Sequence, residues 1–122
     1  MELKYRNLTR EIIGKIIRVH QALGPGFLEK VYQKALIFEL ERSSLRVETE
    51  KEVVIRYEDQ EVGRHRLDLL VEGKVIVELK TVENLSHAHY AQIRSYLKAT
   101  GLKIGLLVNL SSVMADFRRI EL

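Results

Sequence analysis

Cysteine is absent from the 122 residues of this chain. Without thiols the chain has no disulfide scaffold, no thiolate metal site and no cysteine nucleophile. The lack of cysteine fits a reducing compartment, so we expect a cytoplasmic protein. No apolar run approaches the roughly 18 residues that a membrane-spanning helix needs. The first residues are polar, so we expect neither a membrane span nor a secretory signal.

Proline occurs only once and glycine seven times, so few residues interrupt the regular elements. With 46% hydrophobic and 30% charged residues, the composition is that of a globular protein and excludes disordered and fibrous classes. The length predicts a single domain over residues 1–122, with one hydrophobic core. The net charge of +3 permits an anionic partner but does not by itself indicate one.

Two helices are predicted in the first third of the chain. Apolar residues recur at helical spacing over 12–23, and Thr9 is the predicted N-cap of this helix. Gly24 and Pro25 end it. A second apolar stripe at helical spacing covers 28–40.

The remainder alternates between strand and helix patterns. Residues 117–122 fit either a further strand or a last helical turn. The other predicted segments are strands at 53–57, 67–71 and 75–79, a helix at 85–99 and a buried strand at 104–108. The resulting order, ααβββαβ, predicts an α/β or α+β domain.

Two like charges are predicted to face each other in the hairpin between the second and third strands. If Gly73 is the centre of this hairpin, Asp68 lies opposite Glu78. Facing carboxylates destabilise a sheet, and a divalent cation between them would remove that cost, because one or two carboxylates commonly hold Mg²⁺. A solvated strand face explains the pattern equally well, and a register shift of one residue would separate the pair. The other hairpin face is apolar and pairs Leu67 with Leu79, Leu69 with Val77 and Val71 with Val75.

Lys80 follows Glu78 by two residues, so it leaves the strand on the same side. An ammonium at that place is able to orient or deprotonate a water, or to stabilise charge on a phosphate. Other basic residues are scattered along the chain, and solvated surface accounts for them as well as phosphate contact does. The candidates for phosphate contact are Arg64, Arg66, Lys103, Arg118 and Arg119.

Asp68 followed by Glu78-Leu79-Lys80 resembles the core motif of the PD-(D/E)XK nuclease superfamily, with Leu67 in place of the usual proline. The segment 24–32, with Gly26, Glu29 and Tyr32, resembles the signature of the GxxExxY protein family, a small member of that superfamily. The similarity runs in order from about Ile12 to Asn109 and includes His20, His89-Tyr90-Ala91-Gln92, Tyr96-Leu97 and residues 105–109.

The resemblance implies a restriction-endonuclease-like core, in which a central mixed sheet is flanked by helices. Asp68, Glu78 and the Leu79 backbone carbonyl would then bind Mg²⁺ or Mn²⁺, and Lys80 would be the catalytic lysine. Glu29 would contact the metal or a metal-bound water. Taken alone, Glu29 also fits a first helical turn, where the helix dipole favours a carboxylate.

The predicted third helix carries the implied substrate contacts. Gln92 and Tyr96 resemble a Gln-x-x-x-Tyr motif that lines the site and contacts substrate, and His89 shares their helix face. Tyr96 fits equally well as a core residue with a solvated hydroxyl.

The implied function is a Mg²⁺-dependent phosphodiesterase that acts on nucleic acid, with DNA favoured over RNA. The alternative is a non-catalytic module that binds nucleic acid or a protein partner. A decayed copy would have lost some of its ionic set, and retention of all five members favours the enzyme. The set is Glu29, Asp68, Glu78, Lys80 and Gln92. A nuclease domain of this size is expected to act as a homodimer or as a subunit of a larger assembly.

Overall fold

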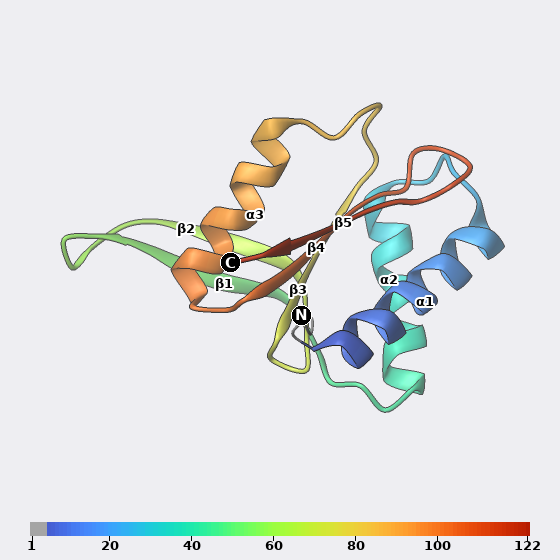
Figure 1. Cartoon of the computed structure of the whole chain (residues 1–122), viewed down its shortest axis with the longest axis horizontal. Helices are drawn as coiled ribbons and strands as arrows, with labels where there is room; N and C mark the ends of the chain where they lie inside the picture. Colours follow the sequence, from blue (N-terminus) through green and yellow to red (C-terminus); the bar gives the residue numbers. More distant parts are fainter. Residues whose placement is uncertain (1–4) are drawn as a thin grey trace.

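Five strands form one sheet that carries helices on both faces (Figure 1). The computed structural model describes residues 5–122, so residues 1–4, which are part of the stretch on which the expected lack of a secretory signal rests, lie outside the described part. The elements are α1 (Arg6–Leu23), α2 (Glu29–Arg42), β1 (Val47–Tyr57), β2 (Gln60–Val71), β3 (Val75–Lys80), α3 (His87–Thr100), β4 (Ile104–Asn109) and β5 (Asp116–Glu121). The predicted α/β architecture is confirmed, with β5 added to the predicted order.

The sheet is mixed, as predicted. Its strands lie in the order β1-β2-β3-β4-β5, and only the pair β3 and β4 is parallel. Parallel neighbours need a long crossover, and α3 supplies it. The central strand β3 therefore ends between α3 on one face of the sheet and α1 and α2 on the other face.

Two apolar clusters hold the layers together. Helices α1 and α2 pack on one face of the sheet, where Ile12, Tyr32 and Leu36 meet residues of β2, β3 and β4. Helix α3 packs on the other face through Ile93 and Leu97. Gly105 of β4 lets α3 approach closely, because a Cβ at this position would lie 2.7 Å from Ile93 Cδ1. Along residues 5–122, no helix combines the length and the apolar character required to cross a membrane.

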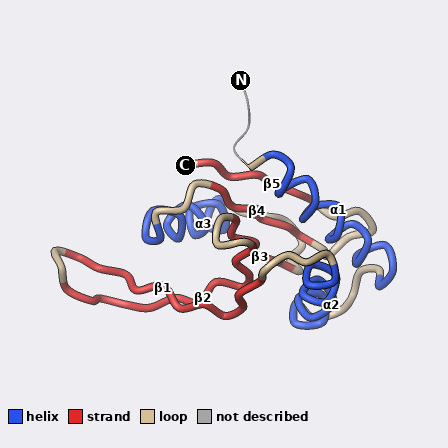
Figure 2. Tube along the Cα trace, turned by 90° about the horizontal axis from the view of Figure 1, so that it is seen from below, coloured by secondary structure: helices blue, strands red, loops and turns tan. Residues whose placement is uncertain are grey.

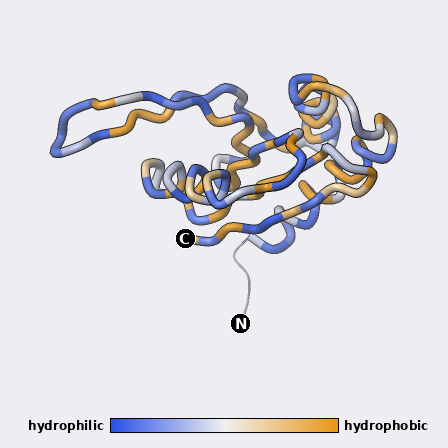
Figure 3. Tube along the Cα trace, turned by 90° about the horizontal axis from the view of Figure 1, so that it is seen from above, coloured by the Kyte–Doolittle hydropathy of each residue, from blue (hydrophilic) through white to orange (hydrophobic). Residues whose placement is uncertain are grey.

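The distal part of the β1–β2 hairpin extends away from the rest of the molecule (Figure 2). Its outer residues are largely hydrophilic (Figure 3), and the two large apolar side chains near its tip, Tyr57 and Val62, are exposed. Both strands are longer than the sequence pattern indicated, since β1 begins at Val47 and β2 at Gln60.

The predicted cap of the first helix is wrong. Tyr5 is the N-cap of α1, and Thr9 lies one turn inside the helix. The Thr9 hydroxyl donates to the backbone carbonyls of Tyr5 and Arg6 and accepts a hydrogen bond from Arg119 Nη1 at 2.8 Å. Thr9 is therefore used as a buried link between α1 and β5.

Candidate active site

The site begins where the backbone pairing of β2 with β3 ends. The pairing has the predicted register, from Val71–Val75 to Leu69–Val77, and Gly73 between the strands adopts a φ of 64° that suits glycine. Beyond Leu69, side chains take over the bonding. The Asp68 N–H donates to Glu78 Oε2 at 3.0 Å, and the Leu79 N–H donates to Asp68 Oδ2 at 2.9 Å. We call Asp68 and Glu78 the carboxylate pair.

The alternation of β2 reverses at Asp68. Leu69 and Val71 belong to the cluster under α1 and α2, whereas both Leu67 and Leu70 belong to the cluster under α3. The prediction that Leu67 shares a face with Leu69 is therefore wrong. The physical reason is a local irregularity that leaves Asp68 between the two faces, where its carboxylate reaches the backbone of β3.

The same irregularity is present on the neighbouring strand. Pairing of β1 with β2 passes from Thr49–Leu69 to Lys51–Leu67 without a pair between them. Glu50, at this gap, has a φ of 51°, in the left-handed region that L residues rarely adopt. The β1–β2 ladder therefore opens beside Asp68.

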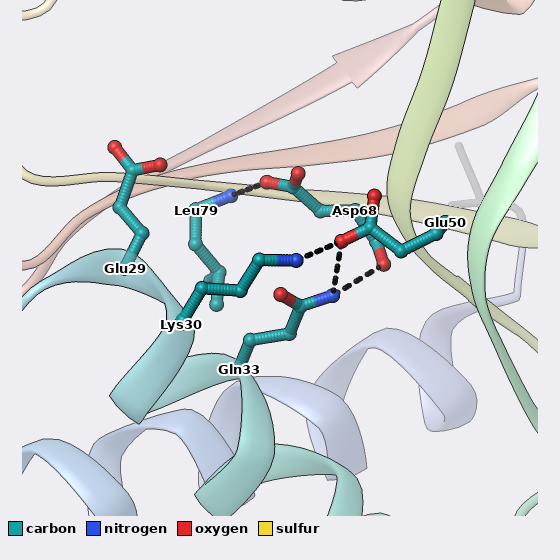
Figure 4. Close-up of a pocket in the computed structure, with 6 residues that line it drawn as sticks. All are labelled: Glu29, Lys30, Gln33, Glu50, Asp68 and Leu79. Atoms are coloured by element: carbon teal, nitrogen blue, oxygen red, sulfur yellow. Dashed lines mark hydrogen bonds and ion pairs between the residues drawn. The ribbon is translucent and has the colours of Figure 1, made fainter.

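Helix α2 fills the opening (Figure 4). The buried side chain of Gln33 donates from Nε2 to the Asp68 carbonyl at 3.0 Å and to Glu50 Oε1 at 3.5 Å. Lys30 Nζ donates to the same Glu50 oxygen, and this hydrogen bond lowers the pKa of Glu50. The backbone that carries Asp68 is thus fixed by a side chain from another element.

A cavity of about 200 Å³ lies between α2 and Asp68, and Glu78 does not line it. Its lining residues are Glu29, Lys30, Gln33, Glu50, Asp68 and Leu79 (Figure 4). Glu29 belongs to the first turn of α2, and its Oε1 accepts a hydrogen bond from the Thr81 N–H at 3.3 Å. Asp68, Leu79 and Glu29, which the sequence placed in one site, therefore line one cavity.

Lys80 and Gln92 meet at the end of β3, where Lys80 Nζ donates to Gln92 Oε1 at 3.3 Å. Gln92 lies on α3 and Glu29 on α2, so the two predicted site residues contact consecutive residues, Lys80 and Thr81, from opposite faces of the sheet. Gln92 does not line the cavity beside Asp68. Gln92 lies instead on the α3 side of the sheet, beside Lys80.

Tyr96 and His89 have other partners. The Tyr96 ring is buried and stacks on His65 with centroids 3.9 Å apart, and its hydroxyl is hydrogen-bonded to His65 Nδ1 at 3.0 Å. Burial raises the pKa of Tyr96 and lowers that of His65. His89 Nδ1 accepts from the Ser86 N–H at 3.0 Å and completes a capping box at the start of α3.

Glu78 is the most perturbed carboxyl of the site. Only 4% of the residue is exposed, and burial, followed by the negative charge of Asp68, raises the pKa of Glu78 to about 8. A pair with one buried carboxyl gains from a cation, because the cation offsets both the desolvation of Glu78 and the repulsion with Asp68. The perturbation marks the carboxylate pair as a functional-site candidate.

The residues present fit a divalent metal by their donor chemistry. One oxygen of each carboxylate is anchored by a backbone N–H, so both groups are fixed in position before any ligand arrives. Mg²⁺ takes hard oxygen ligands and needs only one or two carboxylates when waters complete its shell. Within residues 5–122 no group of three or more His, Cys, Asp or Glu side chains is arranged to hold a metal, so backbone or water ligands would have to contribute.

Sequence reasoning missed Lys30, Gln33 and Glu50. The available signal was Gln33, a polar residue between Tyr32 and Leu36 in the apolar stripe of the second helix. A buried amide needs partners, which makes such a position informative. Its partners lie 17 and 35 residues away, so the sequence did not identify them.

Comparison with known proteins gives one family and one fold. The model of a family described as the PD-(D/E)XK nuclease superfamily matches residues 6–120. The crystal structure of SSO0001 is similar, with a TM-score of 0.62 and 22% sequence identity, over 95% of this chain and 61% of that one. At this identity the likeness concerns the fold alone, and this chain spans about three-fifths of the length of that protein. Among curated proteins, none matches.

Proposed function

The chain belongs to the PD-(D/E)XK nuclease superfamily, and we propose that it is a divalent-metal-dependent nuclease that hydrolyses phosphodiester bonds in DNA in preference to RNA. The observation that supports this best is the carboxylate pair itself. Asp68 and Glu78 lie side by side, anchored through backbone N–H groups, and Lys80 follows Glu78 by two residues. A fold under no demand beyond stability gains nothing from two facing carboxyl groups of which one is buried.

In this proposal Asp68, Glu78 and the Leu79 backbone carbonyl hold Mg²⁺ or Mn²⁺. When bound, such an ion lowers the pKa of a coordinated water and stabilises charge on the phosphoryl oxygens. The two backbone N–H donors keep the carboxylates from turning away, so little reorganisation is needed on binding.

Lys80 is the proposed catalytic lysine. Its ammonium is held by the Gln92 amide oxygen and is able to move a proton at the attacking water or to stabilise the charge that develops on the phosphate. Glu29, whose carboxylate already accepts from the Thr81 N–H, would orient water in the cavity that it shares with Asp68.

Gln92, Tyr96 and His89 remain the proposed substrate-binding residues. Gln92 is exposed and reaches Lys80, which makes it the most direct of the three. Tyr96 would act through its stacked partner His65, and His89 through the ring nitrogen that the helix cap leaves unused. We further propose a GxxExxY-type single domain over 1–122, which acts in the cytoplasm as a homodimer or within a larger assembly.

Substitution of Lys80 tests the enzyme against the binding module. In the Lys80→Ala variant we expect cleavage of single- or double-stranded DNA to fall by about 10²–10⁴-fold, as is typical when a positioned proton-transfer group is lost. Mn²⁺ affinity, measured by titration, should change little because an ammonium is not a ligand. Lys15→Ala on α1 is the matched control.

Two results would overturn the proposal. One is equal cleavage by the wild type, Lys80→Ala and Lys15→Ala. The other is the absence of cleavage of DNA and RNA by the wild type with Mg²⁺ or Mn²⁺, and nucleic-acid binding without cleavage would then favour the non-catalytic module.

A further inference from the structure

A second cavity lies between the β1–β2 hairpin and α3. It has a volume of about 520 Å³ and is lined by Val54, Ile55 and Arg56 of β1 and by Ser95, Lys98 and Ala99 of α3. Figures 1 and 2 both place α3 alongside the base of the hairpin, before its distal part leaves the body of the molecule. We call this cavity the β1–α3 groove.

The groove has an unbalanced charge. Two of its lining residues, Arg56 and Lys98, are basic and none is acidic. In the described part of the chain, neither of these two side chains takes part in an ion pair. Glu61 pairs with Arg56 in the hairpin register, but the hydrogen bonds of the Glu61 carboxylate are to Arg64, and these bonds, helped by the Arg56 charge, lower the pKa of Glu61. The groove therefore presents two cationic side chains that are not held in an ion pair within residues 5–122.

Some of the basic residues suggested by the sequence are held in ion pairs. Arg64 is bound to Glu61 and Glu52, and Arg118 is bound to Asp116. The groove thus offers cations to an external anion at a place that the sequence pattern did not select.

The groove adjoins the proposed site along α3. Gln92, Ser95 and Ala99 follow at spacings of three and four residues, so they lie on one side of the helix. Gln92 contacts Lys80 at one end of this row, and Ser95 and Ala99 line the groove at the other. From Gln92 to Lys98 the helix rises about 9 Å at 1.5 Å per residue. That distance corresponds to roughly two to three nucleotides at 3.4 Å per phosphate of one strand.

We infer that the β1–α3 groove binds one strand of the nucleic acid whose scissile phosphate lies at Lys80. The inference rests on the proposed function, since it takes nucleic acid as the substrate. Arg56, Lys98 and the Ser95 hydroxyl are of the types that contact phosphate and sugar. Val54, Ile55 and Ala99 supply an apolar wall for a sugar or base. A cavity of this volume accommodates a ligand of about nucleotide size and not a duplex segment.

The test is nucleic-acid binding by a variant that carries both Arg56→Glu and Lys98→Glu. Fluorescence anisotropy with a labelled single-stranded oligonucleotide, in chelator and at several salt concentrations, measures binding without cleavage. We expect at least a 10-fold loss of affinity. The slope of log K against log salt should fall by about 1.4, because each phosphate contact on a single strand contributes about 0.7.

The matched control combines Arg10→Glu with Lys15→Glu on α1, which changes the net charge equally on the opposite face of the sheet. We expect its affinity to stay within about 2-fold of wild type at physiological salt, where the Debye length of about 8 Å limits distant effects. Equal weakening by both variants, or no weakening by the groove variant, overturns the inference. So does a wild type that binds no oligonucleotide.

Failure of the groove and failure of the proposed function are distinguishable in this design. If the wild type cleaves with Mg²⁺ and the groove variant binds and cleaves equally well, the groove is excluded and the nuclease stands. If only the groove variant loses binding and neither protein cleaves, the groove stands and the chain is a binding module.

Discussion

At the residue scale, the titration of the Glu78 carboxyl predicts how the unfolding free energy depends on pH. Burial and the charge of Asp68 raise the pKa of Glu78 to about 8, against 4.5 for an ordinary glutamate. Between these values the folded state keeps a proton that the unfolded chain has released. The unfolding free energy of the metal-free protein should therefore fall as pH rises from about 5 to about 8, by at most about 1.4 kcal/mol per pH unit.

The measurement is chemical denaturation in chelator at intervals across that range. In the Glu78→Gln variant the amide does not titrate, so the decline should be absent and the variant should overtake the wild type toward pH 8. Parallel pH profiles for the two proteins would show that Glu78 does not hold the extra proton.

How much of the site was predictable depends on how local each contact is. The opposition of Asp68 and Glu78 follows from symmetry about Gly73, five residues from each, so a two-strand argument was sufficient. Leu67 was misplaced because alternation was assumed to continue through Asp68. The break depends on contacts with Glu50 of β1 and with Gln33 of α2, and no periodicity in the sequence indicates such contacts.

At the element scale, Gln33 ties α2 to the open place in the β1–β2 ladder. Its amide supplies the donor for the Asp68 carbonyl where the ladder has no residue pair. Replacing Gln33 with Leu keeps the helix and the volume but leaves a part-buried carbonyl without that donor. We expect a loss of about 1–3 kcal/mol in unfolding free energy. Mn²⁺ affinity should also fall, because Asp68 would no longer be fixed.

Gln21→Leu, an exposed position on α1, is the control for this prediction. Urea denaturation gives the stability and Mn²⁺ titration gives the affinity. A role in stability alone would lower the first and leave the second unchanged at a temperature where the variant is folded. That result would remove Gln33 from the site.

Element boundaries were predicted best where a strand is buried on both faces. The strands β3 and β4 lie within the core and match their predicted positions closely, because almost every residue in them is apolar. The hairpin strands β1 and β2 are longer than predicted because most of their distal residues are exposed, so no alternation marks them. Polar residues there do not terminate a strand whose partner supplies the backbone hydrogen bonds.

At the scale of the whole molecule, the layered arrangement accounts for where the site is. Helices on opposite faces reach the same end of β3, α2 with Glu29 and α3 with Gln92. The sequence predicted both helices. Only their packing on opposite faces of the sheet brings Gln92 and Glu29 to the consecutive residues Lys80 and Thr81. The family resemblance implied that both side chains converge on the carboxylate pair, which spacing alone did not predict.

The whole fold should respond to metal if the carboxylate pair binds it. A ligand that binds only the folded state stabilises it by mass action, by about 2.7 kcal/mol at a concentration 100 times its dissociation constant. We expect millimolar Mg²⁺ or Mn²⁺ to raise the thermal midpoint of the wild type above its value in chelator. In the Asp68→Asn variant the increase should be largely lost, because one ligand charge is gone.

The same variant separates a metal site from a structural ion pair. In chelator above pH 8, where Glu78 is ionised, Asp68→Asn should leave the midpoint unchanged or raise it, since the substitution removes the repulsion with Glu78 and the asparagine oxygen still accepts from the Leu79 N–H. Asp59→Asn at the hairpin turn is the matched control and should respond to metal as the wild type does. If Mg²⁺ and Mn²⁺ shift the wild type no more than they shift Asp68→Asn, the carboxylate pair is not where metal binds.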